Sequence, residues 1–339
     1  MRNPNSRLGV ARAPRVSTAR LCAPSARQAA ALKDALQSES DAPLDVLVRD
    51  PSSRRTNAWT RGRSCAFELP AGSLLAIPSP LPDVELFVTC PELTFIQVTR
   101  DLDILQVIYS GTALCSEYRI DPSALAGVVL RQGNDKPLTS VARIEAYLGK
   151  AASLCGTVPA TRASHFVLDK ARSPKEIGLA MLFGLPPHLG GFGLGTVALN
   201  EQLDIPDGCD AYGNPRIATR YPDLLITTHD RRGSKRAVAI DYDSFSAHAN
   251  TTSMAKDARR RNEIESVDWL RHYTLTTNEV RDFLYMERFA DRLRRALGQR
   301  RTPQADDAHE TQEEHLRREA VAAKRFELWR RFVSGSGEL

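Results

Sequence analysis

Three aspartates lie inside apolar stretches of the chain, where a negative charge is unfavourable unless a partner compensates it. Asp223 lies within residues 221–226, and Asp241 and Asp243 lie within residues 239–244. Carboxylate oxygens are the ligands that Mg²⁺ prefers, and Mg²⁺ in such a site activates water and neutralises phosphate charge during phosphodiester hydrolysis. These residue types predict a site for Mg²⁺ or Mn²⁺ with hydrolase chemistry.

The two stretches read as the strands of a β-hairpin. Apolar residues surround each acid, and the polar segment 229–235 between the stretches contains Gly233, which favours a turn. A turn centred near Arg232 places Asp223 opposite Asp241, and Asp243 follows on the same face because strand side chains alternate. Like charges placed opposite each other destabilise a sheet. We therefore expect a cation between them.

Two simpler explanations of the aspartates stay open at this point. Asp223 at a strand edge can pair with Arg220 or Arg236. The face that carries Asp241 and Asp243 can also be a solvent face, since the alternate residues 238, 240 and 242 are apolar or aromatic and would fill the core.

Two further residues are candidates for the same site. Glu176 belongs to Ser173-Pro174-Lys175-Glu176, a capping box in which the glutamate reaches back to the Ser173 N–H; alternatively it points into the hairpin and binds metal directly or through water. His248 follows Asp243 by five residues and is a candidate general base or phosphate contact. A histidine in a loop is also common on a polar surface.

A basic helix is expected at residues 253–265, directly after the hairpin. Arg259, Arg260 and Arg261 are candidate contacts to a nucleic-acid backbone. Lys256 is a candidate for stabilising negative charge in the transition state. The simpler interpretation of all four residues is a solvated helix face.

The chain as a whole reads as a globular protein. It has 339 residues, 42% hydrophobic and 26% charged, with a net charge of +5, which is enough for two modest domains. No apolar run approaches the ~20 residues that cross a bilayer, so we expect no membrane partner. Six scattered cysteines without a C-x-x-C pair predict reduced thiols and a cytoplasmic location.

Composition divides the chain into four parts. Residues 1–40 form a basic, largely disordered arm; residues 1–33 contain arginines and no acid, a composition shared with transit peptides. Residues 41–170 form an α+β, mostly helical domain, and residues 171–300 form an α/β unit. Residues 301–339 are a linker and a charged helix that docks on the body, meets a partner subunit or stands in solvent.

The sequence also predicts individual elements. The expected strands are Leu44–Arg49, Cys65–Leu69, Val84–Thr89 and Val267–Thr276. The expected helices are Ala29–Leu36, one from Pro91, Ile104–Tyr118, Ser140–Ala151, Pro159–Lys170, one from Ser173 through Leu185, Glu279–Leu297 and Glu310–Val333.

Residues 173–297 resemble the restriction-endonuclease-like PD-(D/E)XK superfamily, in the branch related to very-short-patch repair endonucleases. The motifs that carry the resemblance are Ser173-Pro174-Lys175-Glu176, Tyr221-Pro222-Asp223-Leu224, Asp241-Tyr242-Asp243-Ser244 with His248, and Asp257 with Arg260. The resemblance implies a central mixed sheet flanked by helices and Mg²⁺-dependent cleavage of DNA. Two positions depart from it: the usual strand glutamate is the shorter Asp241, and the superfamily's lysine is replaced by Asp243, as is frequent in this branch.

The region upstream, about residues 84–170, is loosely similar to the helical domain of AbiEi-type antitoxins. The similarity rests on Val88-Thr89-Cys90-Pro91-Glu92 at a helix start and on Gly156–Lys170 before the Ser-Pro-x-Glu motif. The winged helix that usually precedes such a domain is not evident.

Two functional hypotheses follow from the sequence. The first is a Mg²⁺- or Mn²⁺-dependent DNA endonuclease, or a close descendant, in which Asp223, Asp241 and Asp243 hold metal while Glu176 and His248 assist. The alternative is an inactive nuclease-fold protein that binds DNA or a partner in a toxin–antitoxin or phage-defence system. An RNA-directed nuclease and a homo-oligomer stay open.

Overall fold

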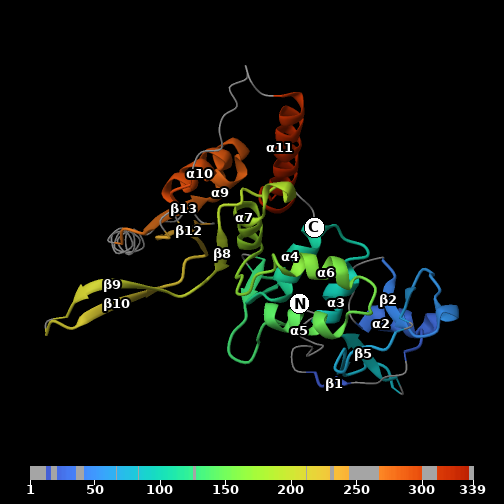
Figure 1. Cartoon of the computed structure of the whole chain (residues 1–339). Coiled ribbons are helices and arrows are strands. Elements are labelled where there is room, and N and C mark those ends of the chain that lie inside the picture. Colours follow the sequence, from blue (N-terminus) through green and yellow to red (C-terminus); the bar gives the residue numbers. More distant parts are fainter. Residues whose placement is uncertain are drawn as a thin grey trace. The chain divides into compact units, whose positions relative to one another are not determined.

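The computed structural model is mixed α/β with several small sheets (Figure 1). It describes residues 13–16, 21–35, 42–65, 67–82, 84–124, 127–210, 212–229, 233–243, 267–299 and 311–335. The chain divides into two compact units, the first made of residues 1–114 and 119–165 and the second of residues 115–118 and 166–339. The break near residue 165 falls before the helix that carries Glu176.

The first unit combines small sheets with short helices. Its strands are β1 (Arg15–Val16), β4 (Leu74–Ile77) and β5 (Leu86–Thr89) in one antiparallel sheet, and β2 (Leu44–Val48) parallel to β3 (Thr60–Ser64) in another; β6 (Tyr118–Ile120) pairs with β7 (Val128–Leu130). Its helices are α2 (Ala26–Ala35), the short η2 (Pro51–Ser53), α3 (Pro91–Val98), α4 (Ile104–Leu114), α5 (Val141–Lys150) and α6 (Thr157–Ser164).

Four expectations for this part of the chain differ from the structure, one of which is the helix expected at Pro159–Lys170: it is α6, which ends at Ser164. The strand expected at Cys65–Leu69 is wrong: β3 ends at Ser64, and it pairs with β2 through Arg61 and Arg63, which both bond Asp45. Helix α4 ends at Leu114 rather than Tyr118, because Tyr118 begins β6. Within the arm expected to be unfolded, Arg15–Val16 form β1 on the edge of β4.

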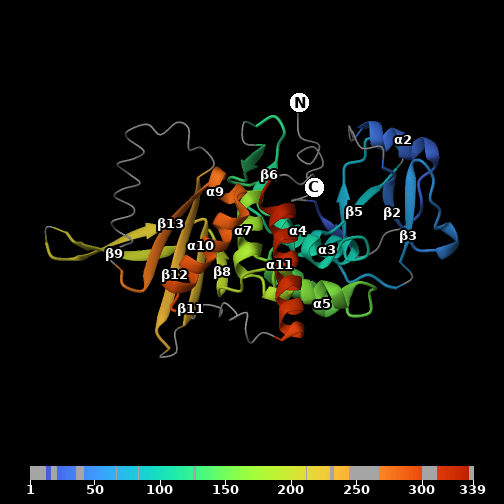
Figure 2. The same ribbon diagram turned by 90° about the horizontal axis from the view of Figure 1, so that it is seen from above.

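The second unit contains the predicted hairpin at the centre of a four-stranded mixed sheet. Its order is β13 (Leu270–Thr276), β12 (Lys235–Asp243), β11 (Leu224–His229), β8 (Thr196–Leu199). Strand β11 is antiparallel to both β12 and β8, and β13 is parallel to β12. Figure 2 shows these strands side by side.

Helices cover one face of this sheet. They are α7 (Pro174–Gly184), which contacts β8 and β11, and α10 (Phe283–Ala296), which contacts β12 and lies across the strands in Figure 2. Phe289 of α10 meets Tyr273 of β13 edge-on, with ring centroids 5.6 Å apart. The single helix expected at 279–297 is two, because Asp282 ends α9 (Thr277–Arg281) and caps α10.

The opposite face carries the acids and a second apolar cluster. Leu225, Ala237 and Ala239 are buried there against Leu203 and Ile205. Asp241 and Asp243 lie on the same side as the two alanines; a solvent face does not explain the partly buried Asp241, but it remains sufficient for Asp243, which is exposed.

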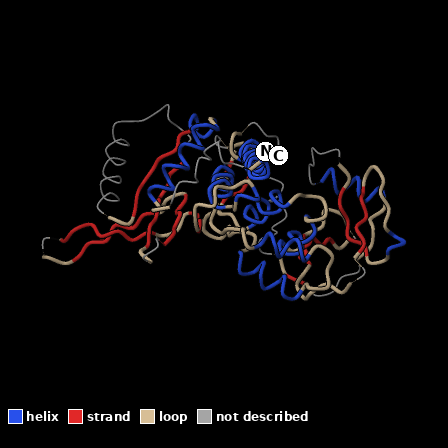
Figure 3. Tube along the Cα trace, turned by 45° about the horizontal axis from the view of Figure 1, so that its top comes forward, coloured by secondary structure: helices blue, strands red, loops and turns tan. Residues whose placement is uncertain are grey.

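Leu203 and Ile205 belong to a hairpin that the sequence did not predict. Strand β9 (Leu203–Cys209) pairs with β10 (Pro215–Arg220), and the hairpin extends away from the central sheet (Figures 1 and 3). Pro206 and Gly208 interrupt the pattern that signals a strand, so the sequence there reads as loop. The base of β10 leads directly into Asp223.

The glycine-rich turn after α7, which includes η3 (Pro187–Leu189), is tightly packed rather than flexible. Its amides bond back to the helix: Phe192 N donates to Leu182 O at 2.7 Å and Leu194 N to Phe183 O at 2.9 Å. A Cβ on Gly191 would lie 2.0 Å from the Leu185 carbonyl oxygen. The glycines allow the chain to fold back against its own helix.

The substitution Gly191→Ala is expected to lower the free energy of unfolding by at least about 1–3 kcal/mol, the usual cost of overpacking, because the obstacle is backbone. The matched control is Gly149→Ala in α5, where no atom lies within 4 Å of the added Cβ. That change should be neutral or slightly stabilising. Urea denaturation of both variants measures the difference, and equal midpoints would refute the tight turn.

The charged C-terminal helix α11 (Gln312–Phe332) docks on the body of the second unit. Leu328, Phe332 and Val333 at its end are buried, and Lys175 Nζ donates to the Val333 carbonyl at 2.5 Å. Its N-terminal turns are exposed. Of the three alternatives, docking on the body is the one observed.

Candidate active site

Asp223 and Asp241 lie side by side where the central hairpin ends. Leu224 pairs with Ile240, so the same register places Asp223 opposite Asp241, as predicted. The Asp223 N–H donates to Asp241 Oδ1 at 3.3 Å, and the Tyr242 N–H donates to Asp223 Oδ2 at 2.7 Å. Each carboxylate therefore points toward the other strand of the hairpin, and the two acids are direct neighbours on the sheet.

Asp241 has a second partner, His272 of β13. The His272 Nε2 lies 2.8 Å from Asp241 Oδ2, and the two side chains are 7% and 18% exposed. His272 pairs in register with Ala239, so it stands on the acid-bearing face. An ionised carboxylate offers about four acceptor positions, so Asp241 can hold both the Asp223 N–H and the His272 ring.

Asp243 ends β12, two residues beyond Asp241, and is exposed. Within the described ranges, no three or more His, Cys, Asp or Glu side chains gather closely enough to hold a metal ion. The described structure therefore brings together Asp223 and Asp241 as a pair and does not gather Asp243 with them.

Glu176 is buried at the first turn of α7, with 5% exposed. Ser173 Oγ donates to Glu176 Oε1 at 2.9 Å and accepts from the Glu176 N–H at 3.2 Å. The capping box is shifted from the expected form, since the backbone N–H that reaches Oε2, at 2.9 Å, belongs to Arg172 rather than Ser173. Capping uses both oxygens of Glu176 and still leaves its charge uncompensated.

The electrostatics of Glu176 link it to the aspartate pair. Burial, with the negative charge of Asp223, raises the pKa of Glu176 to about 7, against the hydrogen bonds from Arg172, Ser173 and Asn200, which lower it. A buried carboxyl group whose pKa lies near 7, with a second acid close by, is frequent in functional sites.

This shift predicts a pH dependence of stability. The pKa of Glu176 is raised from 4.5 to about 7 in the folded chain, so its contribution is present below pH 4.5 and lost as pH rises through 7. We expect the free energy of unfolding to fall by about 3 kcal/mol across this window in the absence of added metal. Glu176→Gln should lack that component, and denaturation of both proteins from pH 4.5 to 8 tests it; parallel profiles would contradict it.

Asn200 joins Glu176 to the strand that follows Asp223. It comes directly after β8, is 3% exposed and has a φ of 48°, a left-handed conformation that asparagine tolerates. Its N–H donates to the Asp223 carbonyl at 3.2 Å, and its Nδ2 donates to Glu176 Oε2 at 2.7 Å.

Five predicted positions lie outside the described residues. They are the site residues His248, Lys256, Arg259, Arg260 and Arg261; Asp257, the partner of Arg260 in the resemblance, also lies outside them. Their roles in proton transfer and phosphate binding stay predictions.

Sequence reasoning missed His272 and Asn200. His272 stands in the strand Leu270–Thr276, but only the parallel pairing with β12 brings it to Asp241, and such pairing leaves no local signal. Asn200 had a weak signal: an asparagine directly after an apolar strand is a common site of left-handed backbone.

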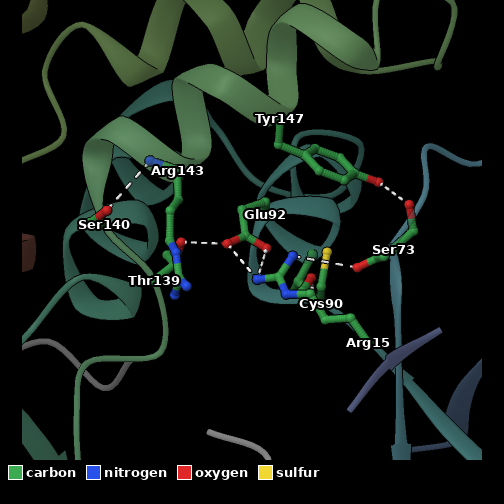
Figure 4. A network of polar contacts seen from close by, with 10 residues as sticks. Arg15, Ser73, Cys90, Glu92, Thr139, Ser140, Arg143 and Tyr147 are labelled. Atoms are coloured by element: carbon green, nitrogen blue, oxygen red, sulfur yellow. Dashed lines mark hydrogen bonds and ion pairs between the residues drawn. The ribbon is translucent and has the colours of Figure 1, made fainter. Parts of the chain in front are cut away.

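The first unit holds another buried carboxylate, Glu92, in a network that is internally satisfied (Figure 4). Arg15 Nη2 contacts its two oxygens at 2.9 and 3.0 Å, and Thr139 Oγ1 donates at 2.6 Å. Burial raises the pKa of Glu92, but the bonds from Arg15 and Thr139 outweigh it and hold that pKa below its usual value. Nearby, burial raises the pKa of the Cys90 thiol to about 12. This network is structural, because its charges are paired and its thiol stays protonated.

No family model, curated protein or solved structure matches the chain. The described helices include none that is long and apolar enough to cross a membrane. All six cysteines lie within the described ranges, and none of them forms a disulfide.

Proposed function

We propose that the chain is a Mg²⁺- or Mn²⁺-dependent endonuclease that hydrolyses DNA, with Asp223 and Asp241 as its central pair. The observation that carries this proposal is their adjacency: the Asp223 N–H lies 3.3 Å from Asp241 Oδ1. Two carboxylates placed opposite each other cost stability, and a divalent cation offsets that cost. Few carboxylates and several waters are the usual Mg²⁺ environment.

The fold around the pair supports the same proposal. The resemblance implies a central mixed sheet flanked by helices, and the four strands carry α7 and α10 against one face. Motif residues Glu176, Asp223 and Asp241 are linked in space through Asn200 and the hairpin. Acids that only serve as surface charges would not need to be connected by such hydrogen bonds.

Each residue has a separate task in this proposal. Asp223 and Asp241 hold the cation, and Glu176 adds negative charge from the side of α7. His272 orients Asp241 through its 2.8 Å contact. When bound, the cation would activate water and neutralise the phosphate.

The second candidate is an inactive nuclease-fold protein that binds DNA or a protein partner. Two observations favour it. His272, a base that carries positive charge when protonated, already contacts Asp241. The described residues also contain no group of three or more metal-ligating side chains. Such a protein would keep the hairpin acids as a structural pair.

Plasmid nicking distinguishes the two candidates. The full chain is incubated with supercoiled DNA and Mg²⁺ or Mn²⁺, with EDTA as the metal-free control and Asp241→Ala as the variant. The nuclease proposal expects metal-dependent nicking that Asp241→Ala removes. Nicking that survives the substitution, or no nicking with single-stranded, duplex or RNA substrates, would reject it.

A further inference from the structure

Asn200 has one side-chain atom whose position calls for a ligand. Its Oδ1 is buried and accepts no hydrogen bond from any described residue. An unsatisfied buried acceptor costs about 1–3 kcal/mol, and in native proteins a water or an ion usually explains it.

Reversing the amide does not remove the problem. Asn200 Nδ2 donates to the Lys170 carbonyl at 3.0 Å as well as to Glu176 Oε2 at 2.7 Å. The Lys170 carbonyl can only accept, so the nitrogen must face it. The orientation is therefore fixed by chemistry, and the oxygen is the atom left without a donor.

The surroundings of Asn200 favour a cation over an anion. Its side chain contacts the Glu176 carboxyl, and its N–H donates to the main-chain carbonyl oxygen of Asp223 at 3.2 Å, so both acidic residues are neighbours of Asn200. Two acids so close make the local potential negative. Side-chain amide oxygens are, with carboxylates, ordinary ligands of hard divalent cations.

We propose that Asn200 supplies its side-chain oxygen to the same divalent-cation site as Asp223, making it a ligand residue that joins the helix acid to the hairpin acids. This inference rests on the proposed metal site. It explains why a non-glycine residue keeps a φ of 48° at this point, since the left-handed turn carries the amide to Glu176.

The test is a Mn²⁺ titration of the full chain. The electron paramagnetic resonance signal of free Mn²⁺ measures how much of the ion is bound. The informative pair is Asn200→Gly and Asn200→Asp. Both lose the Nδ2 donors to Lys170 and Glu176, and both residues are compatible with the left-handed backbone. Only Asn200→Asp keeps an oxygen at this position.

We expect Asn200→Gly to weaken Mn²⁺ binding about tenfold or more, while Asn200→Asp binds at least as tightly as the wild type. Gln202→Glu, two residues away and exposed, adds a negative charge without that oxygen and should change affinity little. Equal affinity of Asn200→Gly and wild type, equal weakening in both Asn200 variants, or tightening by Gln202→Glu that matches Asn200→Asp, would overturn the inference.

Asp223→Asn separates failure of this inference from failure of the proposed function. If wild type binds Mn²⁺ and Asp223→Asn does not, the site stands and the Asn200 variants decide the ligand role. If wild type binds no Mn²⁺, both proposals fall.

Discussion

Replacing Asp223 with asparagine is expected to lower metal-dependent DNA cleavage by more than about 100-fold. Loss of residues that only support a ligand costs about 10–100-fold, and Asp223 is proposed as a ligand itself. The substitution removes the carboxylate charge of Asp223. It keeps an oxygen acceptor for the Tyr242 N–H, which in the wild-type chain donates to Asp223 Oδ2 at 2.7 Å. Initial rates of plasmid nicking with saturating Mg²⁺ measure the effect.

The matched control for this variant is Asp268→Asn. Asp268 is an exposed acid of the same unit, so this change removes an equal charge away from the pair and should leave the nicking rate unchanged. Thermal denaturation should place both variants within a few degrees of the wild type. Cleavage by Asp223→Asn within about threefold of wild type, or equal loss in Asp268→Asn, would contradict the assignment.

Replacing Arg15 with alanine is expected to lower the free energy of unfolding by about 3 kcal/mol. Glu92 is 2% exposed, and Arg15 contacts both of its oxygens. Removing one partner of such a pair leaves a buried charge uncompensated, which costs about 3–5 kcal/mol; the partial exposure of Arg15 favours the lower end. Urea denaturation measures the change.

The double variant Arg15→Ala with Glu92→Gln tests the electrostatic cause. Glutamine keeps an acceptor for Thr139, which donates to Glu92 at 2.6 Å, and carries no charge. The double variant should therefore be more stable than Arg15→Ala alone. This electrostatic cause is contradicted if Arg15→Ala lowers the free energy of unfolding by less than about 1 kcal/mol, or if the double variant is less stable than Arg15→Ala. Either result would show that Arg15 of β1 does not stabilise Glu92 by compensating its charge.

Local patterns predicted the hairpin that carries the acids. Alternation of apolar and polar residues and a turn expected near Arg232 predict its register, because a one-residue slip would move every side chain to the other face. Asp223 and Asp241 therefore meet where the sequence placed them. Helix starts at Pro91 and Pro174 were equally local, since proline suits the first helical turn.

The missed features all depend on contacts distant in sequence. His272 reaches Asp241 only because β13 joins β12 in parallel, and the Asn200 amide meets Glu176 across a separation of 24 residues. The strand β3 was placed too late because charge pairs with Asp45, rather than apolar alternation, align it with β2. Tertiary partners decide such positions, and local propensity does not record them.

The most direct test of the shared-cation claim is anomalous scattering from crystals of the full chain grown with Mn²⁺. The proposal predicts one strong anomalous peak within ligand distance of both the Asp223 and Asp241 carboxylates. A peak bound elsewhere, or none while His272 keeps its contact with Asp241, would contradict it.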